Sequence, residues 1–314
     1  MLAYVLKRVL YVVPIVFFVA LVCFLLVHIA PGDPLVSILP PDASADLAAQ
    51  LRAAYGFDRP LPVQFGLWIL KALNGDLGTS IASGRPVLTE VMRAVGNTLI
   101  LAGVAASIGF IAGVTLGLLA GYFRDTFVDK LATGIAIAGV SVPHYWLGMV
   151  LVIIFSVQLR WLPAVGAWNG DFTFTWDAIQ FLVLPALTMA VIPMGIVTRT
   201  VRALVGDILG QDFVEALRAK GLGEGRVFAH VIRNAAPTAI AVMGLQLGYL
   251  LGGSILIETV FSWPGTGFLL NSAIFQRDLP LLQGTILVLA LFFVFLNLVV
   301  DVAQAAIDPR IKRS

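Results

Sequence analysis

The sequence predicts an all-α integral membrane protein with six transmembrane helices and both termini in the cytoplasm. First, the 314-residue chain is 59% hydrophobic and only 12% charged, whereas soluble domains carry about 25% charged residues. Second, lysine and arginine gather in alternate loops. Third, a helix needs about 20 apolar residues to cross the ~30 Å hydrocarbon layer. Six windows meet this length: 9–30, 97–121, 131–158, 179–199, 238–260 and 282–306.

The distribution of positive residues predicts the orientation, because they accumulate on the cytoplasmic side. With a cytoplasmic N-terminus, most of the 20 Lys and Arg residues fall inside. The exceptions lie mainly in segment 31–96, and a segment of that length crosses the membrane regardless of charge. The window after Lys7 and Arg8 is too long for a signal peptide, and no small-residue cleavage site follows it. We expect it to be a retained anchor.

Segment 31–96 predicts a small folded cap outside the cytoplasm. The turn-forming stretches "PGDP", "FDRPLP" and "NGDLGTS" surround two short amphipathic helices, 44–55 with Ser44 as N-cap and 62–73. The cap either rests on the bilayer surface or provides a docking platform for an extracytoplasmic partner. The chain is therefore expected to divide into an anchor 1–30, this cap, a core 97–306 with a cytoplasmic loop 207–237, and a tail 307–314.

Two predicted helices carry a glycine at every fourth position. The second span has Gly109, Gly113, Gly117 and Gly121, and the fifth has Gly244, Gly248 and Gly252. A spacing of four places these glycines on one helix face, where two backbones can approach closely. The partner is either a helix of this chain or a second, similar chain.

The fifth span also has a polar face opposite its glycines. That face carries Gln246, Tyr249 and Ser254, with Glu258 to one side near the outer end. Polar groups in a membrane normally face a bundle interior or a watery path. These residues therefore either form interhelical hydrogen bonds or border a translocation path. The non-helical stretch "TVFSWPGTG" follows and predicts a structured outer mouth containing Phe261, Trp263, Pro264, Gly265 and Gly267.

Motifs for catalysis do not occur in the chain. No lysine follows a glycine, which excludes the phosphate-binding G-x-x-x-x-G-K-[ST] loop, and neither H-E-x-x-H nor G-x-S-x-G is present. The net charge of +2 does not favour nucleic-acid binding. His28, His144 and His230 fall on different sides or depths of the membrane, so we expect no metal or haem site. Pro143 predicts a kink in the third span.

The cytoplasmic loop 207–237 concentrates charge in a chain that has little. Two short helices, roughly 208–220 and 224–234, flank Gly221, which permits a sharp reversal with positive φ. Glu215 and Arg218 lie on adjacent turns, where they can pair with each other or with a partner. The loop is either a knob that fits a socket on a soluble partner or a solvated loop. The residues alone leave both interpretations open.

A family resemblance favours the knob. Glu215-Ala216, followed by Gly221 and then "HVIRNAAP", resembles the EAA loop of ABC-importer membrane subunits. More narrowly, it resembles the B-type permease of the dipeptide, oligopeptide, nickel and glutathione importers. Further motifs follow in register: "PGDP", "GDLGTS", "GRPV", "NTL", "RAKG", "RNA", "ETVFSWPGTG" and "DPRI". Leu217 replaces the second alanine and Pro237 comes late, and both departures fit the peptide and nickel branch.

The resemblance implies a type I ABC importer permease fold in the bacterial inner membrane, working by alternating access. It implies a C-type sister permease, two cytoplasmic ATPase subunits that carry ATP and Mg, and an extracytoplasmic substrate-binding protein that docks on the cap and outer mouth. No cofactor is expected in this chain. The implied coupling residues are Glu215, Ala216, Arg218, Lys220, Gly221, Arg226, Arg233 and Asn234.

The substrate and two other functions stay open at this point. Short peptides lead, and glutathione, nickel chelates, opines and oligosaccharides remain candidates. An exporter or channel without a binding protein is disfavoured by segment 31–96 and the knob. A non-transporting membrane anchor is disfavoured by the polar face of the fifth span.

Overall fold

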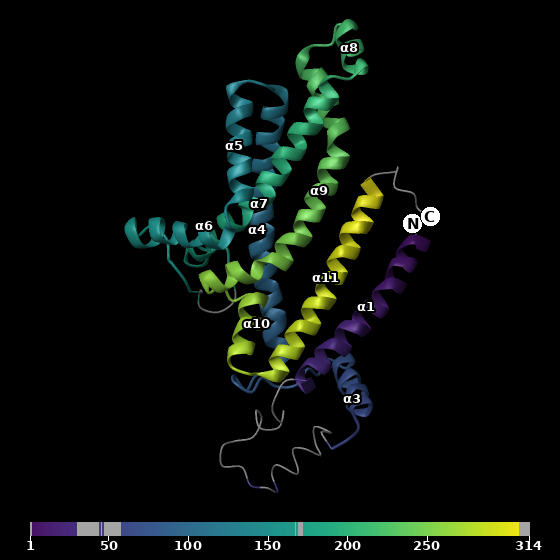
Figure 1. Ribbon diagram of the computed structural model, residues 1–314, viewed down its shortest axis with the longest axis vertical. Coiled ribbons are helices and arrows are strands. Elements are labelled where there is room, and N and C mark those ends of the chain that lie inside the picture. The colour runs from purple at the N-terminus through teal and green to yellow at the C-terminus, as the bar shows by residue number, and fades with distance from the viewer. Residues whose placement is uncertain are drawn as a thin grey trace. The chain divides into compact units, whose positions relative to one another are not determined.

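The computed structural model describes residues 2–29, 44, 46, 58–166, 168 and 172–307. Within these ranges the chain is helical apart from turns and one isolated β-bridge between Thr79 and Pro86 (Figure 1). The predicted all-α class is therefore confirmed. In chain order the helices are α1 (Leu2–Ile29), α3 (Leu61–Leu73), α4 (Val87–Tyr122), α5 (Phe127–Ser141), α6 (His144–Leu151), the π-helix η2 (Val152–Gln158), α7 (Trp176–Leu209), α8 (Asp212–Ala219), α9 (Glu224–Phe261), α10 (Thr266–Phe275) and α11 (Leu279–Ile307).

The long apolar helices agree with a membrane protein. Among the described residues, four helices are long and apolar enough to span a bilayer, namely α4, α7, α9 and α11, and a bent pair of helices raises the number to five at most. The part of α1 whose side chains are described contains the shorter apolar run Leu10–Leu25. Six spans and cytoplasmic termini stay predictions.

The third predicted span, 131–158, is wrong as a single helix. It divides into α5 and the pair α6–η2, which are bent by 101° at the break between Ser141 and His144. Proline has no backbone N–H, and it disfavours helical backbone at the residue before it. Accordingly Val142 is extended, with φ −84° and ψ 127°, and α6 starts directly after Pro143. The sequence located the distortion correctly but underestimated it.

The short helices predicted around Gly221 also need correction. α7 continues to Leu209, and the first short helix, α8, begins only at Asp212. The second one does not end at residue 234, because it forms the first turns of the 38-residue α9, which runs through Pro237. Spanning helices tolerate an internal proline when neighbouring groups satisfy the freed carbonyl. The loop 207–237 is therefore continuous with the helix of the predicted fifth span.

The contacts divide the chain into two compact units, one of residues 1–97 and 264–298 and the other of residues 98–263 and 299–314. In the first unit, a core of Val87, Val91, Ala273 and Leu281 joins the start of α4 to α10 and α11. The predicted helix 62–73 is confirmed as α3.

α3 packs on α1 through aromatic rings, with the ring centroids of Phe24 and Phe65 5.4 Å apart. The predicted helix 44–55 lies outside the described residues except for Ser44 and Asp46, and the tail 307–314 lies outside them except for Ile307. The functional roles expected of these segments stay predictions.

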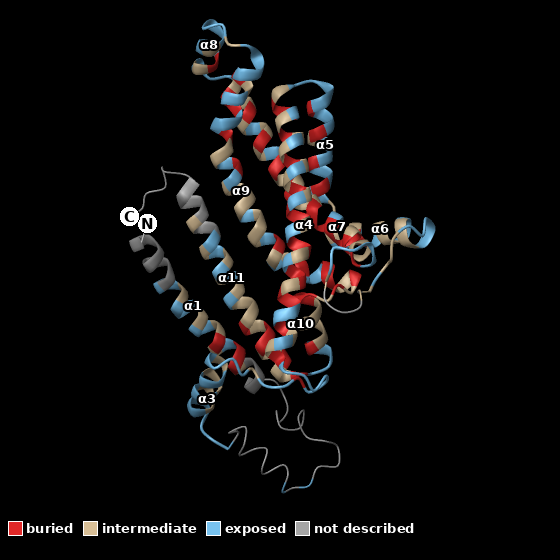
Figure 2. Cartoon of the chain, turned by 180° about the vertical axis from the view of Figure 1, so that it is seen from behind, coloured by how far each residue is buried: buried red, intermediate tan, exposed pale blue. Residues whose placement is uncertain are grey.

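In the second unit, α4 packs closely on α7 along its glycines. A Cβ added to Gly117 would lie 2.7 Å from the Cβ of Val201, and one added to Gly113 would lie 2.9 Å from the Cβ of Val197. Buried residues accordingly line these helices (Figure 2). For the second span, packing within this chain is thus confirmed. On α9, by contrast, a Cβ added to Gly252 would have nothing within 4 Å.

An ion pair joins α5 to α7. The buried carboxylate of Asp129 accepts hydrogen bonds from both Nε and Nη2 of Arg202, the latter at 2.7 Å. The backbone N–H of Asp125, in the turn between α4 and α5, donates to the same carboxylate at 3.0 Å. Asp129 therefore ties one turn and two helices together at the end of the unit where α8 lies.

Candidate functional site

The turn after α8 is built around Gly221. Its φ of +79° confirms the predicted left-handed conformation. The N–H of Gly221 donates to the carbonyl of Arg218 at 2.9 Å, and the N–H of Leu222 donates to the carbonyl of Leu217 at 3.2 Å. This pair of bonds is the Schellman motif, which satisfies the last carbonyls of a helix and reverses the chain. Leu217 and Leu222 both pack on the same hydrophobic cluster.

Buried apolar side chains fix the base of the loop to the rest of the unit, and its surface is polar and exposed. Within α8, all of which is described, the buried residue is Val214. It packs in a cluster with Val205 of α7 and with Val227 and Val231 of α9. The residues predicted for coupling are all exposed: Glu215, Ala216, Arg218, Lys220, Gly221, Arg226, Arg233 and Asn234. We call α8, the turn and the first turns of α9, residues 212–234 within the predicted loop 207–237, the coupling loop after the role predicted for it.

The ion pair within the coupling loop differs from the expected one. Arg218 binds Glu224 at the start of α9, with Nε–Oε1 and Nη2–Oε2 distances of 2.9 and 3.1 Å. The hydrogen bond to Glu224 raises the pKa of the Arg218 guanidinium. The turn at Gly221 brings the two charges together, which the helical spacing of Glu215 and Arg218 could not indicate. Exposed pairs of this kind contribute little to stability. Glu215 itself lies at an exposed position on α8.

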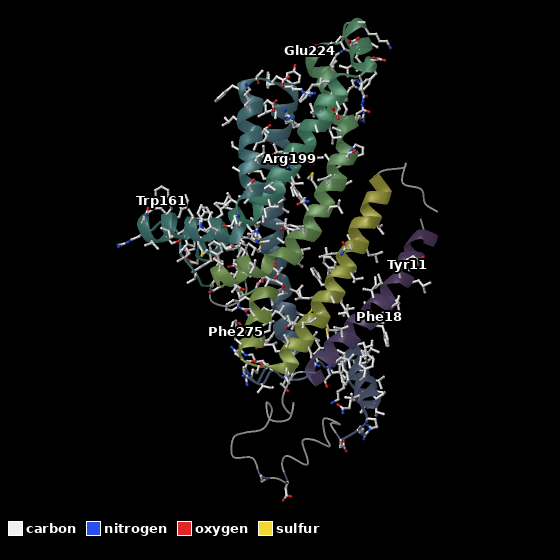
Figure 3. All side chains as sticks on the ribbon, in the orientation of Figure 1. Tyr11, Phe18, Trp161, Arg199, Glu224 and Phe275 are labelled. Atoms are coloured by element: carbon white, nitrogen blue, oxygen red, sulfur yellow. The ribbon has the colours of Figure 1, made fainter. Side chains whose placement is uncertain are left out.

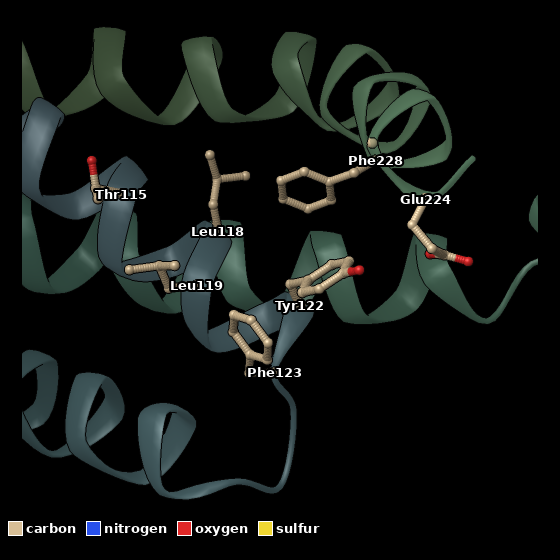
Figure 4. A pocket seen from close by; sticks show the side chains of 8 residues that line it. Thr115, Leu118, Leu119, Tyr122, Phe123, Glu224 and Phe228 are labelled. Carbon is tan, nitrogen blue, oxygen red and sulfur yellow. The ribbon is translucent and has the colours of Figure 1, made fainter. Parts of the chain in front are cut away.

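A groove lies where the coupling loop meets the end of α4. Its volume is about 370 Å³, and it is lined mainly by Leu118, Leu119, Tyr122, Phe123 and Phe228 (Figure 4). The rings of Tyr122 and Phe228 meet edge to face, with centroids 4.9 Å apart. Glu224 also lines the groove and stands near α8 in Figure 3. A displacement of the coupling loop would therefore shift α4 through the contact between these aromatic side chains.

The predicted path residues lie in different environments along α9. Tyr249 is half-exposed, and the Oε1 atom of Gln246 is buried with no hydrogen-bond partner within the described part of the chain. Ser254 and Glu258 are fully buried. The hydroxyl of Thr98 donates to Oε1 of Glu258 at 2.8 Å, which connects α4 to α9. In this conformation Ser254 and Glu258 do not line an open path, and their role in one stays a prediction.

The turn after α9, which was predicted to form the outer mouth, is mostly buried. Ser262 ends α9 with φ of +51°, and the N–H of Trp263 donates to the carbonyl of Glu258 at 2.8 Å. Trp263 is fully buried beside Trp168, with ring centroids 4.8 Å apart. Phe261, Gly265 and Gly267 are also buried, and Pro264 is half-buried. The buried side chains of Phe261 and Trp263 shape the turn from inside. The docking role stays a prediction.

Sequence reasoning missed a group of hydrogen bonds around one buried carboxylate in the first unit. The buried carboxylate of Asp278 accepts hydrogen bonds from the Ser80 hydroxyl at 2.6 Å, from the Ala82 N–H at 3.1 Å and from the Leu281 N–H at 3.1 Å. It therefore caps α11 and holds the "GDLGTS" turn at the same time. An aspartate three residues before a helical N–H is a capping signal, but the partner Ser80 is 198 residues away in sequence.

Known proteins resemble this chain over its whole length. The family described as "Binding-protein-dependent transport system inner membrane component" matches residues 113–313, and its N-terminal companion matches residues 1–102. The Glutathione transport system permease protein GsiC of Escherichia coli is 42% identical over 313 residues, which cover 99% of each chain. The protein of the same name from Salmonella typhimurium matches equally.

A solved structure supports the fold. The MetNI methionine ABC transporter, in an inward-facing conformation, aligns with a TM-score of 0.55 at 19% identity. The alignment covers 69% of this chain and 96% of the transporter chain. The full-length relatives and the family match agree with the helical membrane fold. The chain therefore belongs to the family of binding-protein-dependent transport system inner membrane components.

Proposed function

We propose that this chain is the permease subunit of an ABC importer for short peptides, and that the coupling loop connects it to the ATPases. The observation that carries the proposal is the structure of the coupling loop. Its eight predicted coupling residues are exposed, and its buried valines pack against α7. Force can pass from a partner to the membrane helices only through a part that does not deform. The packing of Val214, Val227 and Val231 against α7 provides that stiffness.

The full-length relatives support the substrate class. They are named as glutathione permeases, and glutathione is a peptide of three residues. The proposed substrate is thus a di-, tri- or oligopeptide of this size. A substrate-binding protein would select it, so the permease needs only a path that tolerates different side chains. Gln246, Tyr249, Ser254 and Glu258 are the proposed border of that path.

The proposed complex contains this chain, a C-type sister permease, two cytoplasmic ATPases that bind ATP and Mg, and an extracytoplasmic binding protein. Closure of the ATPase dimer would move the coupling loop with its socket. The aromatic contact between Phe228 and Tyr122 would carry part of that motion to α4, and the packing of α9 on α7 would carry the rest. Alternating access follows when these helices rearrange together.

The coupling role is tested with Glu215→Ala, measured by co-purification of the ATPases and by ATP hydrolysis stimulated by the binding protein. We expect a folded permease that recruits the ATPases weakly or hydrolyses ATP without transport. The matched control is Asp177→Ala, an exposed carboxylate in the first turn of α7, at the end of that helix opposite α8. Wild-type values in both assays for Glu215→Ala would contradict the coupling role.

The importer itself is tested by uptake of glutathione and dipeptides into proteoliposomes that contain the assembled complex. We expect uptake that requires both ATP and the binding protein. Uptake without the binding protein would indicate an exporter or channel running in reverse. No transport despite an intact complex would indicate a membrane anchor.

The path is tested separately by single cysteines at positions 246, 249 and 258 in a Cys23→Ser background. Cys23 is buried in the structure. We expect reaction with water-soluble thiol reagents in at least one nucleotide state, because an open path admits water. Inertness at all three positions in every state would contradict the assignment.

A further inference from the structure

Helices α6 and η2 form an arm, residues 144–158, that leaves α5 at 101°. One face of the arm packs on the protein. Gly148 is buried, and a Cβ added to it would lie 3.0 Å from the ring of Phe261. Leu151, Val152 and Phe155 pack against the core cluster of the second unit. The arm therefore supports the end of α9, where the outer turn begins.

The opposite face of the arm is apolar and uncovered within its unit. It carries Trp146, Met149, Ile153 and Val157, which are 50%, 43%, 51% and 62% exposed. Their spacing of three or four residues places them on one side of the helix. Residues 144–158 contain no Lys, Arg, Asp or Glu. A helix that is apolar on both faces needs protein on one side and an apolar medium on the other.

The length of α5 indicates how deep the arm lies. α5 starts beside the end of α7 that leads to α8, because Arg124 in the preceding turn lies 3.2 Å from a Cβ added to Gly206. Its 15 residues rise about 22 Å at ~1.5 Å per residue. The hydrocarbon layer is about 30 Å thick, so an upright α5 that starts at one boundary would place the start of the arm roughly 8 Å below the other boundary. Helices that lie in the plane of a bilayer are buried about 5–10 Å.

The residues at the two ends of the arm also favour a position near the membrane interface. Tyr145 and Trp146 stand at its start, and the exposed Arg160 and Trp161 follow its end (Figure 3). Tyr and Trp prefer the membrane interface, because their rings have a polar and an apolar part. The break between α5 and α6 also exposes Ser141 and Pro143. Carbonyls freed at such a break need water or headgroups, which a shallow position supplies.

The exposed face of the arm continues a lipid-facing surface. On α5, Val128, Leu131 and Ile135 are exposed apolar residues at helical spacing. Acyl chains are the apolar medium that surrounds a protein of this inner-membrane family. We propose that the α6–η2 arm lies parallel to the membrane plane in the leaflet farther from α8, with Trp146, Met149, Ile153 and Val157 in contact with lipid. The arm thereby holds the Phe261 end of α9 at a constant depth.

The test measures the depth of nitroxide labels in the assembled complex in lipid bilayers. Single cysteines replace Met149, Ile153 or Val157 in the Cys23→Ser background, and collisions with oxygen and with a water-soluble nickel chelate give the depth. We expect the three labels to lie at the same depth within about 3 Å, because the arm is parallel to the surface. The matched control uses Val128, Leu131 and Ile135 of α5, whose depths should differ by about 10 Å at ~1.5 Å per residue.

Three results would overturn the proposal. A depth gradient along the arm as steep as that of α5 would show a helix that crosses the membrane. Few collisions with either reagent would show that a protein, such as a second permease chain, covers the face. Frequent collisions with the nickel chelate alone would show a face in water. Because all three labelled positions are exposed, the labels do not need to displace a packed side chain.

Discussion

Both α4 and α9 carry glycines spaced by four, but the space around these glycines differs between the two helices. On α4, each glycine from Gly109 to Gly121 lies against α7, and an added Cβ would come within 2.7–2.9 Å of an α7 atom. On α9, an added Cβ at Gly252 would meet nothing within 4 Å. The same spacing therefore identifies a close helix packing on α4, whereas on α9 Gly252 has space around it. A glycine ridge indicates that a backbone can approach, but not which backbone does.

The difference suggests distinct roles for the two helix faces. The packed side, formed by α4, α5 and α7, is a rigid core with valines inserted over glycines and an ion pair between Asp129 and Arg202. The free side of α9 is available to the proposed sister permease. Four substitutions would test which of these surfaces are packed and which are free.

The largest effect is expected for Gly117→Leu. The new side chain would overlap the backbone oxygen of Thr198, only 2.8 Å from the added Cβ, as well as Val201. Overpacking typically costs about 1–3 kcal/mol, and a backbone obstacle cannot rotate away. We expect little folded protein in fluorescence-detected size-exclusion chromatography. Gly103→Leu, on the same helix with nothing within 4 Å, should behave like the wild type. Equal behaviour of the two variants would contradict the close packing.

The next effect is expected for Asp129→Asn, which removes the charge that two nitrogens of Arg202 share. Hydrogen bonds to charged groups contribute roughly 1.5–3 kcal/mol, and Arg202 keeps partial access to water at 32% exposure. We therefore expect a lower Tm in detergent, at the lower end of that range in free energy. Asp177→Asn makes the same chemical change at an exposed position of α7 and should leave the Tm unchanged. An unchanged Tm for Asp129→Asn would show that α5 and α7 are held by apolar packing alone.

A smaller effect on stability, but a large one on coupling, is expected for Gly221→Val. No atom lies within 4 Å of an added Cβ, so only the positive φ resists the change, with a strain of about 1–3 kcal/mol. Gly221→Asn should retain coupling, because Asn tolerates this conformation. ATP hydrolysis stimulated by the binding protein is the measurement, and Gly225→Val is the control without positive φ. Equal activity of the Gly221→Val and Gly221→Asn variants would exclude backbone strain as the cause.

The smallest effect is expected for Gly252→Ala in the isolated chain, where the added methyl group has space. Its Tm should equal that of the wild type. If the free face receives the sister permease, the yield of assembled heterodimer should fall, because the backbones can no longer approach as closely. A lower Tm of the isolated chain would place Gly252 in a packed interface. Unchanged assembly would show that the second chain binds elsewhere.

Two prolines illustrate how far local sequence can predict a helix. Pro143 ends α5 and turns the chain by 101°, whereas α9 passes through Pro237 without ending. Both lack the same N–H. Whether the helix survives depends on which groups surround the freed carbonyl and on what packs against each side. The sequence therefore predicted a distortion at Pro143, but it could not predict how far the chain turns there.

The sequence by itself determined features that depend on composition and on near neighbours along the chain. These are the membrane class, the charged loop around Gly221 and the left-handed turn at Gly221, since each follows from hydropathy, periodicity or the φ that a residue allows. Only the tertiary structure decided the pairings across long stretches of chain. Thr98 binds Glu258 over 160 residues, Ser80 binds Asp278 over 198, and Arg202 binds Asp129 over 73. Such partners are brought together by helix packing, which minimises the free energy of the whole bundle and leaves no signal in either local segment.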